Sequence, residues 1–319
     1  MKPSIHIEID GIASALVMDR LISLTITDEA GNRSDRLELI FDDRTPHLAL
    51  PHKGVEIAVA LGWGEAVPLG LFTVDDTGAA PGTVSIEGKA VSMTKVMKAP
   101  KTRSWEDRTL GQIVDAIAAE HGLEGAAASE LASEAIPYLS QTAESDLALL
   151  TRLASERGAS AKPKGGKLLF YPRGRQADAL NADPVALSEP DFVDWQWNAA
   201  DKPVYNSVRA WWRDHEAGER RQITLGSGEP SIELSDTYNT EQKARAAAQA
   251  RLDRSKRKSG TLTGCKLARG NPRLRAEGRA RIDGLREGPD GLWTLQSVTH
   301  RVTKEGFLSD FSAERALED

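Results

Sequence analysis

Short alternations of apolar and polar residues fill the first hundred residues of the chain. Ile5, Ile7 and Ile9 alternate with polar neighbours, and the same alternation recurs at 37–41 between turn signals. An apolar side chain at every second position is typical of a strand with one buried face. The pattern therefore predicts a small β-barrel or β-sandwich over residues 1–100.

The period then changes to that of helices. Apolar residues recur at helical spacing over about 110–121 and again over about 144–157. Thr109 and Gln112 have the spacing of a capping box, which would begin the first of these helices. Strand-like segments flanking Gly165-Gly166 predict a hairpin, because this dipeptide tolerates the positive φ angles of a tight turn.

The last part of the chain returns to strands. Residues 176–202 hold Pro184 and Pro190 and show little regular spacing, which predicts a connection. Strand patterns resume from about 204, and Thr240 can cap an Ala-rich helix that runs to about Lys258. We therefore predict a mixed, β-rich α+β fold in which two tube-like β-barrel or sandwich modules flank a small α+β central region. The predicted divisions are 1–100 for the first module, 101–175 for the centre, 176–202 for the connection and 203–319 for the second module.

An internal echo supports the idea of two similar modules. Gly70-Leu-Phe-Thr-Val near the end of the first β region matches Gly291-Leu-Trp-Thr-Leu near the end of the last. An alternating strand that follows a glycine precedes each motif, at 54–59 and at 278–283. A shared order of strand, glycine-bearing loop and strand indicates a duplicated module, so three copies of the chain would present six similar modules. Gly70 and Gly291 are therefore candidate structural or interface positions.

Composition and charge narrow the class of protein. The chain is 40% hydrophobic and 28% charged and has no apolar run near the roughly 20 residues that span a bilayer, so we expect no membrane anchor. Its first ten residues alternate and lack a signal-peptide pattern, so we expect synthesis and assembly in the cytoplasm and no secretion by a cleaved signal. The single cysteine, Cys265, excludes an intrachain disulfide. It lies in a strand-like stretch without a nearby histidine, so we do not expect a nucleophile there.

Several segments resemble one family in order and spacing. They are Thr109-Leu-Gly-Gln-Ile-Val-Asp-Ala-Ile, Ser145-Asp-Leu-Ala-Leu-Leu-Thr-Arg-Leu-Ala, Lys167-Leu-Leu-Phe-Tyr-Pro and Gly291-Leu-Trp-Thr-Leu-Gln-Ser-Val. Together they are similar to the late control protein D family of contractile-tailed phages and to the hub portion of VgrG proteins. The resemblance spans about residues 5–315.

The resemblance implies a structural baseplate hub of a phage tail or tail-like particle. It implies a homotrimer whose two tube-like modules per chain form a pseudo-hexameric ring. The tail tube protein would lie on one side of this ring and a needle-like spike on the other, with further baseplate proteins around it. The sequence ends at Asp319 without the long repetitive β-helix of VgrG, so we expect the spike to be a separate protein.

An enzyme is the first alternative, because baseplates also carry peptidoglycan hydrolases. A glycosidase would need two carboxylates about 5 to 10 Å apart across a cleft. Glu65, Asp75 and Asp76, or Asp191 and Asp194, could be nominated, but nothing in the pattern ties them to a cleft. The six histidines are scattered, and no zinc-protease motif occurs. We expect no catalytic, cofactor-binding or metal-binding residues.

A nucleic-acid-binding protein is the second alternative. Basic residues gather at 251–258 and at 269–281, as an electrostatic footprint would require. However, no aromatic residue for base stacking lies among them, and the formal net charge of the chain is −6. A solvated or interprotein face is therefore the favoured interpretation of this basic excess.

Four tryptophans are candidate interface residues. Trp195 and Trp197 would share one face of a strand, whereas Trp211 and Trp212 would point to opposite faces. Packing in a core is the default for each of them. A subunit interface is the alternative, because buried tryptophans anchor interfaces strongly.

Overall fold

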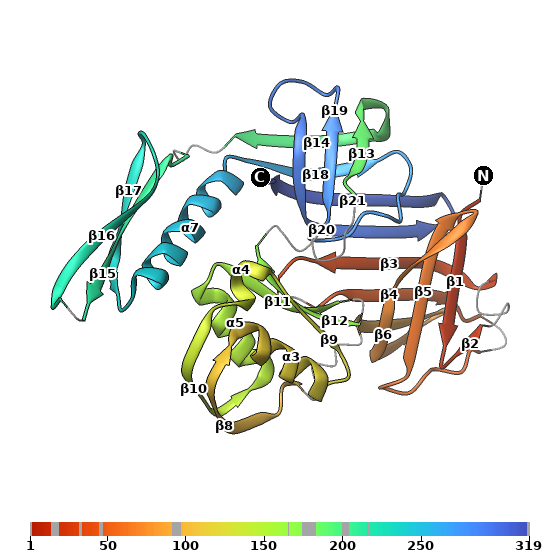
Figure 1. Cartoon of the computed structure of the whole chain (residues 1–319). Coiled ribbons are helices and arrows are strands. Elements are labelled where there is room, and N and C mark those ends of the chain that lie inside the picture. Colours follow the sequence, from red (N-terminus) through yellow and green to blue (C-terminus); the bar gives the residue numbers. More distant parts are fainter. Residues whose placement is uncertain are drawn as a thin grey trace.

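The computed structural model consists mainly of strands, which form two curled β-modules above a smaller α+β region (Figure 1). The residues that it describes are 2–13, 19–31, 34–44, 47–90, 97–164, 166–173, 183–199, 204–215 and 217–317. Within these residues no helix is both long and apolar enough to cross a membrane. The β-rich α+β class predicted from the pattern is confirmed.

The first module is a curled antiparallel sheet. Its strands are β1 (Ser4–Ile9), β2 (Ile12–Ala13), β3 (Leu21–Glu29), β4 (Arg36–Asp42), β5 (Glu56–Trp63), β6 (Glu65–Ala80) and β7 (Thr83–Ala90). Strict alternation buries Leu24 and Ile26 on β3 and Leu37 and Leu39 on β4. Strands β1 and β5 cross over this layer in Figure 1, so the apolar faces meet in one core.

The second module is built from later strands around Trp293, Leu295 and Phe311. Its strands are β13 (Val185–Ser188), β14 (Phe192–Ala199), β18 (Gly260–Leu267), β19 (Arg279–Asp283), β20 (Gly291–Thr303) and β21 (Gly306–Arg315). Two of them, β13 and β14, lie in the stretch 176–202, which the pattern had assigned to a connection. The prolines of this stretch misled that assignment, because Pro184 precedes β13 and Pro190 lies in the single 3₁₀ turn Glu189–Asp191 before β14.

The two modules use the same strand order. In the first, the hydrogen-bonded path is β3-β4-β7-β6-β5-β1, and in the second it is β14-β18-β21-β20-β19-β13. Corresponding strands also follow one another in the same order along the chain. The first four neighbouring pairs of each path are antiparallel, and only the last pair differs, since β1 is antiparallel to β5 whereas β13 is parallel to β19.

The sequence echo falls at equivalent places in this shared topology. On β6, Val74 pairs with Gly88 and a bulge follows directly, and on β20, Leu295 pairs with Ala313 and a bulge follows in the same way. The residue before each bulge forms two backbone hydrogen bonds, which we call a clamp. Val74 bonds to residues 54 and 55, just before β5, and Leu295 bonds to residues 277 and 278, just before β19. The match therefore reflects a repeated structure, as the echo suggested.

Those clamps correct the alignment of the echo by one residue. The amide of Gly54 donates to Val74 O at 2.9 Å, and its counterpart is Glu277, whose amide donates to Leu295 O at 2.7 Å. Both residues have a positive φ, +96° and +65°. The sequence pattern pairs Gly54 with Gly278 by identity, but the backbone role of Gly54 is taken by a glutamate.

The central region packs two helices against strands. Its elements are β8 (Pro100–Thr109), α3 (Leu110–Glu120), β9 (Glu124–Ala127), α4 (Ser129–Ala132), β10 (Ala135–Ser145), α5 (Asp146–Glu156), β11 (Ala159–Lys164) and β12 (Lys167–Pro172). The predicted helices and hairpin are confirmed. The capping box forms, with Thr109 Oγ1 accepting from the Gln112 amide at 3.3 Å and Gln112 Oε1 accepting from the Thr109 amide at 3.0 Å.

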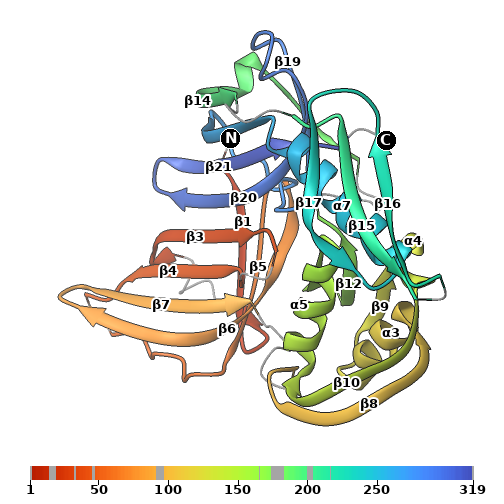
Figure 2. The same ribbon diagram turned by 90° about the vertical axis from the view of Figure 1, so that its left-hand side faces the viewer.

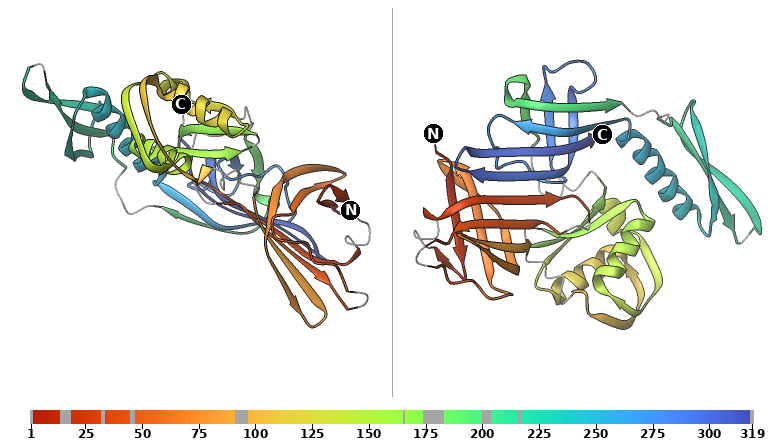
Figure 3. Two further views of the ribbon diagram at one scale, coloured as in Figure 1. Left: turned by 90° about the horizontal axis from the view of Figure 1, so that it is seen from below. Right: turned by 180° about the vertical axis from the view of Figure 1, so that it is seen from behind.

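Residues 204–258 form a separate unit, which we call the arm. It contains β15 (Ser207–Asp214), β16 (Glu219–Gly226), β17 (Ser231–Tyr238) and α7 (Glu241–Arg257). The strands form their own three-stranded sheet, and α7 covers one face of it through Ala244 and Ala248. The arm projects from the β-modules at one end of the molecule (Figure 3). The sequence predicted its helix but placed its strands in the second module.

Candidate functional site

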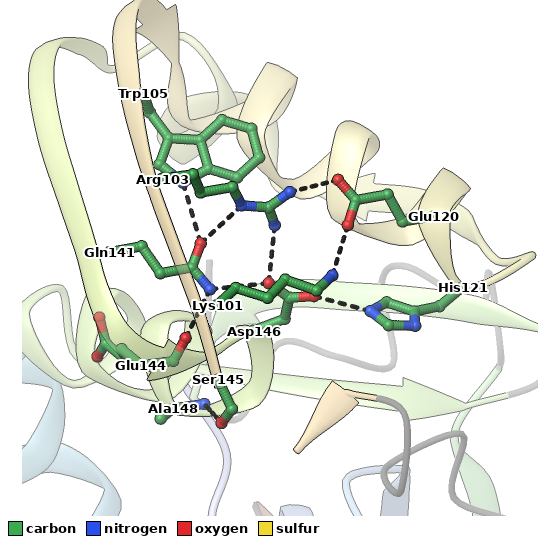
Figure 4. A network of polar contacts seen from close by, with 10 residues as sticks. All are labelled: Lys101, Arg103, Trp105, Glu120, His121, Gln141, Glu144, Ser145, Asp146 and Ala148. Atoms are coloured by element: carbon green, nitrogen blue, oxygen red, sulfur yellow. Dashed lines mark hydrogen bonds and ion pairs between the residues drawn. The ribbon is translucent and has the colours of Figure 1, made fainter. Parts of the chain in front are cut away.

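A buried polar network joins the elements of the central region, and Asp146 lies at its centre (Figure 4). This residue begins α5, whose N-cap Ser145 accepts from the Ala148 amide at 3.2 Å. The side chain of Asp146 is fully buried. Its partners come from β8, from the end of α3 and from β10, so four elements converge on one carboxylate.

Each oxygen of the Asp146 carboxylate has two partners. Oδ2 lies 2.6 Å from Lys101 Nζ and 2.9 Å from His121 Nε2. Oδ1 lies 2.7 Å from Arg103 Nη2 and 2.9 Å from Gln141 Nε2. A buried carboxylate must satisfy its lone pairs in this way to remain charged inside a protein.

A second carboxylate shares the same cations. Glu120, the last residue of α3, accepts from Lys101 Nζ at 2.7 Å and also from Arg103. Lys101 and Arg103 alternate along β8 and therefore project from the same face of the strand. Two cations thus bridge two carboxylates, and the network fastens α3 and α5 to β8.

The charges of this network hold both acids in the ionised form. Burial alone would raise the pKa of Asp146, but hydrogen bonds from Lys101, Gln141 and His121 outweigh it and lower the pKa from 3.8 to about 2. Burial likewise opposes ionisation of Glu120, whose pKa is nevertheless lowered by Lys101 and Arg103. Neither group is therefore suited to act as a protonated general acid near neutral pH.

The same cluster is the place where a metal ion could be considered. One ligand atom from each of Glu120, His121 and Asp146 lies within 4.8 Å of the others. However, the Lys101 ammonium group is 2.6–2.7 Å from both carboxylates and occupies the position that a cation would take. These residues form a complete network of ion pairs and do not fit a metal site.

The structure also shows what His121 does. It is the C-cap of α3, and its side chain is buried and binds the Asp146 carboxylate. His300 lies on β20, where Nδ1 contacts Ser309 Oγ at 2.8 Å.

Two of the acids nominated for hydrolysis, Asp75 and Asp191, have structural partners. Asp75 forms ion pairs with Lys53 and Lys89, which lower its pKa. Asp191 accepts from the Ser188 amide at 2.7 Å and thereby caps a 3₁₀ turn. Cys265 is fully buried, and burial raises the pKa of its thiol to about 12, so the nucleophilic thiolate is not formed.

A second polar cluster fastens the central region to the first β-module. Lys162 on β11 reaches the turn between β3 and β4, where its Nζ donates to Glu29 O at 2.6 Å and lies 2.9 Å from Asp35 Oδ1. The second module joins at the same place, because the Gly31 amide donates to Glu277 Oε1 at 2.7 Å. All three parts of the chain therefore meet around one turn.

The sheets of the two modules are continuous inside one chain. Residues 297–302 of β20 pair with residues 24–29 of β3 in antiparallel register (Figure 2). The second module thus continues the sheet of the first at β3, and we call this contact the intrachain seam.

The tryptophans occupy two kinds of position. Trp195 and Trp197 both pack on the core of the second module. Trp212 packs into the core of the arm, whereas Trp211 lies on the opposite, open face of the sheet. There the Arg220 guanidinium stacks 4.3 Å from the ring of Trp211, and the Trp211 Nε1 donates to Glu233 Oε1 at 2.7 Å.

A side chain at Gly70 or Gly291 would crowd its neighbours, and both residues have a positive φ, +157° and +125°. A Cβ on Gly70 would lie 3.3 Å from the ring of Phe72. A Cβ on Gly291 would lie 2.7 Å from Arg315 Nη1. An interface role for either glycine or for the tryptophans stays a prediction.

Several members of the basic excess take part in packing. Arg257 is buried and lies 3.3 Å from the Glu314 carboxylate. Arg275 donates to Pro68 O at 2.7 Å, across the two modules. Arg269 stacks 4.1 Å above the ring of Trp63. These three arginines hold elements of the chain together.

No local signal in the sequence marks the polar network or the Lys162 cluster. The alternation of Lys101 and Arg103 along a strand predicts only that they share a face. Their acidic partners lie 17 to 45 positions away and come together only after β8, α3 and α5 have packed.

Comparisons with known proteins agree with the resemblance seen in the sequence. A family model described as phage tail baseplate hub (GPD) matches residues 71–306. The probable baseplate hub protein of Escherichia phage P2 is 29% identical over 350 residues, covering 95% of this chain and 90% of that protein. That of Escherichia phage 186 is also 29% identical, over 94% of this chain and 90% of that protein.

Solved structures share the fold. A 43 kDa tail protein of prophage MuSo2 from Shewanella oneidensis has a TM-score of 0.71 at 17% identity, over 98% of both chains. An Escherichia coli component of the type VI secretion system has a TM-score of 0.60 at 14% identity, over 98% of this chain and 77% of that one. The family match covers well over half of the residues. The chain therefore belongs to the phage tail baseplate hub (GPD) family.

Proposed function

We propose that this hub protein is a non-enzymatic homotrimer that joins a sixfold tail tube to a threefold spike. The observation that carries the proposal is the repeated strand order, β3-β4-β7-β6-β5-β1 and β14-β18-β21-β20-β19-β13. One chain presents two similar β-modules side by side, linked by the intrachain seam. Three chains would therefore present six.

Symmetry explains why a duplicated module suits this role. A sixfold tube needs six equivalent surfaces, whereas a threefold spike needs three. If the two modules alternate around a ring, three chains supply the six surfaces through closed, heterologous contacts. The central region and the arm occur once per chain, so they supply three copies each and suit a threefold partner.

The chemistry of the polar network supports a structural role. A glycosidase of the peptidoglycan-hydrolase type needs one carboxylic acid that stays protonated near neutral pH, through a raised pKa. Glu120 and Asp146, whose carboxylates approach within 4.8 Å, show the opposite shift of pKa, and Lys101 and Arg103 bridge them. The network thus suits a framework that must keep its shape.

Several partners follow from this role. The tail tube protein would meet the six β-modules on one side of the ring. A separate spike protein would meet the threefold elements on the other side, and further baseplate proteins would surround the ring in the virion tail. An Escherichia coli component of the type VI secretion system shares the fold, which is consistent with an injection apparatus.

Light scattering on the purified chain tests the stoichiometry. Each chain has a mass of 34.6 kDa, so the proposal expects a particle of three such chains. Averaged electron-microscope images of that particle should show six alike lobes on one side. A stable monomer at micromolar concentration would count against the trimer, and peptidoglycan turnover lost on changing Glu120→Gln would count against the non-enzymatic role.

A further inference from the structure

Among the strand edges that lack a strand partner in the described residues, two are related by the internal repeat. One is the outer edge of β14, which pairs only with β18. The other is the second half of β6, because β5 pairs with β6 only as far as Thr73 while β7 continues to Ala80. Unpaired edges carry free backbone donors and acceptors, which proteins usually cover. Val193 on β14 is also 70% exposed.

The internal repeat identifies what each edge corresponds to. In the repeat, β14 is the counterpart of β3, and β6 is the counterpart of β20. In the intrachain seam, the second half of β20 pairs with β3. The second half of β6 and the edge of β14 are therefore the two halves of the same kind of seam, left open toward opposite ends of the continuous sheet.

We propose that a second copy of the chain closes this seam, so that β14 of one copy pairs with residues 77–80 of β6 of the next. This proposal rests on the trimer proposed above, and it adds the strands, direction and register of the contact. Strand direction is antiparallel, as in the intrachain seam. A ring closed in this way leaves neither edge exposed, because each copy gives one edge and receives the other.

The register follows from matched pairings. Ile26 pairs with Leu37, which pairs with Gly88, the partner of Val74. In the second module Trp197 pairs with Leu262, which pairs with Ala313, the partner of Leu295. Ile26 therefore corresponds to Trp197.

The other half of the seam is matched in the same way. Asp76 and Ser297 are the first paired residues after the two bulges, so Ala79 corresponds to His300 and Ala80 to Arg301. In the intrachain seam His300 pairs with Ile26. The seam between copies therefore pairs Ala79 with Trp197.

The remaining pairs follow by stepping along the antiparallel strands. They are Ala80 with Gln196, Gly78 with Asn198 and Thr77 with Ala199. Side-chain sizes are complementary, because Gly78, Ala79 and Ala80 are small where their partners on β14 include a tryptophan and two amides. Small residues directly opposite large ones leave room for the larger side chains on each face of the shared sheet.

Paired cysteines test the register. Ala80 and Gln196 are both exposed in the chain, so Ala80→Cys with Gln196→Cys should leave the fold intact. Mild oxidation should then link chains and give covalent dimers and trimers on a non-reducing gel. The native Cys265 is buried and does not interfere.

A matched control shifts one cysteine by one residue. In Ala79→Cys with Gln196→Cys, the first cysteine points to the other face of β6, so cross-linking should fall at least about tenfold. A trimer by light scattering that gives no link from Ala80 and Gln196 would overturn the seam while leaving the hub proposal in place. A monomer would overturn the proposed trimer itself, and the seam with it.

Discussion

Changing Asp146 to asparagine should destabilise the central region, because it removes the charge on which the buried network depends. Lys101, Arg103 and His121 all bind this carboxylate, which is fully buried. In the variant, Lys101 and Arg103 would keep their ion pairs with Glu120. An amide of the same shape still accepts hydrogen bonds, so the packing of α5 should be preserved.

The shifted pKa gives the size of the effect. A fall from 3.8 to about 2 corresponds to about 2 kcal/mol of stability, at about 1.4 kcal/mol per pKa unit. Removing one partner of a buried ion pair typically costs about 3 to 5 kcal/mol. The asparagine amide keeps part of the hydrogen bonding and so reduces this loss. We therefore expect Asp146→Asn to lower the free energy of unfolding by about 2 to 4 kcal/mol at pH 7.

The sign of the pH dependence follows from the lowered pKa. The stabilisation from Asp146 is fully present above pH 3.8 and is lost as the pH falls through about 2. The wild-type chain and the variant should therefore differ at pH 7 and converge near pH 2. Urea unfolding across this range measures the difference, and hydrogen exchange of α3 and α5 assigns it to the central region.

The control is Glu124→Gln. Glu124 lies in the same region, is exposed and forms one surface ion pair with Lys167, so its loss should cost at most about 1 kcal/mol. An equal effect of the two variants at pH 7, or a difference that persists unchanged at pH 2, would refute the ionic role assigned to Asp146.

Further predictions concern the cores and the junction. Ile113→Ala or Leu150→Ala should each cost about 2 to 5 kcal/mol in urea unfolding, because both side chains are fully buried; a loss below about 0.5 kcal/mol at both sites would contradict the packing. Cys265 should resist a maleimide at pH 8 until urea is added, and rapid labelling of the native chain would show that it is accessible. Lys162→Met should speed hydrogen exchange at the β3–β4 turn, whereas Lys167→Met at a surface pair should not.

The parts of the fold that local chemistry dictates can be predicted from the sequence. Thr109 and Thr240 each cap a helix at the predicted residue, since a side chain and an amide three positions apart suffice for the cap. The alternation of β3 and β4 similarly gives their buried faces. The echo at Gly70 and Gly291 locates the repeat, because a bulge and a clamp recur at fixed distances from it.

The parts that depend on distant partners cannot be predicted in this way. Strand β13 has four residues and pairs with β19 more than ninety positions later, so no local period identifies it. The strands of the arm alternate as those of the second module do, and only α7 decides that they form their own sheet. The polar network likewise depends on helices and strands that meet only in the folded chain.

The place of the arm shows how a sixfold frame could acquire threefold character. In the first module, β3 is joined to β4 by a short turn, 30–35, which holds Lys162 through Asp35. In the second module the corresponding strands are β14 and β18, and the same connection is expanded into the arm.

Insertion at this connection leaves strand order and register intact, because loops tolerate added residues whereas a slip of one residue would turn a buried face outward. The proposed ring would therefore have this connection at six corresponding positions. Three of them would be turns that bind the central region, and the three between them would be projecting arms. In that ring, strand pairing would keep the modules alike where they meet a sixfold tube, and the differing connections would serve a threefold partner. Such a division explains why the repeat is plain in the strand order and limited to five matching residues in the sequence.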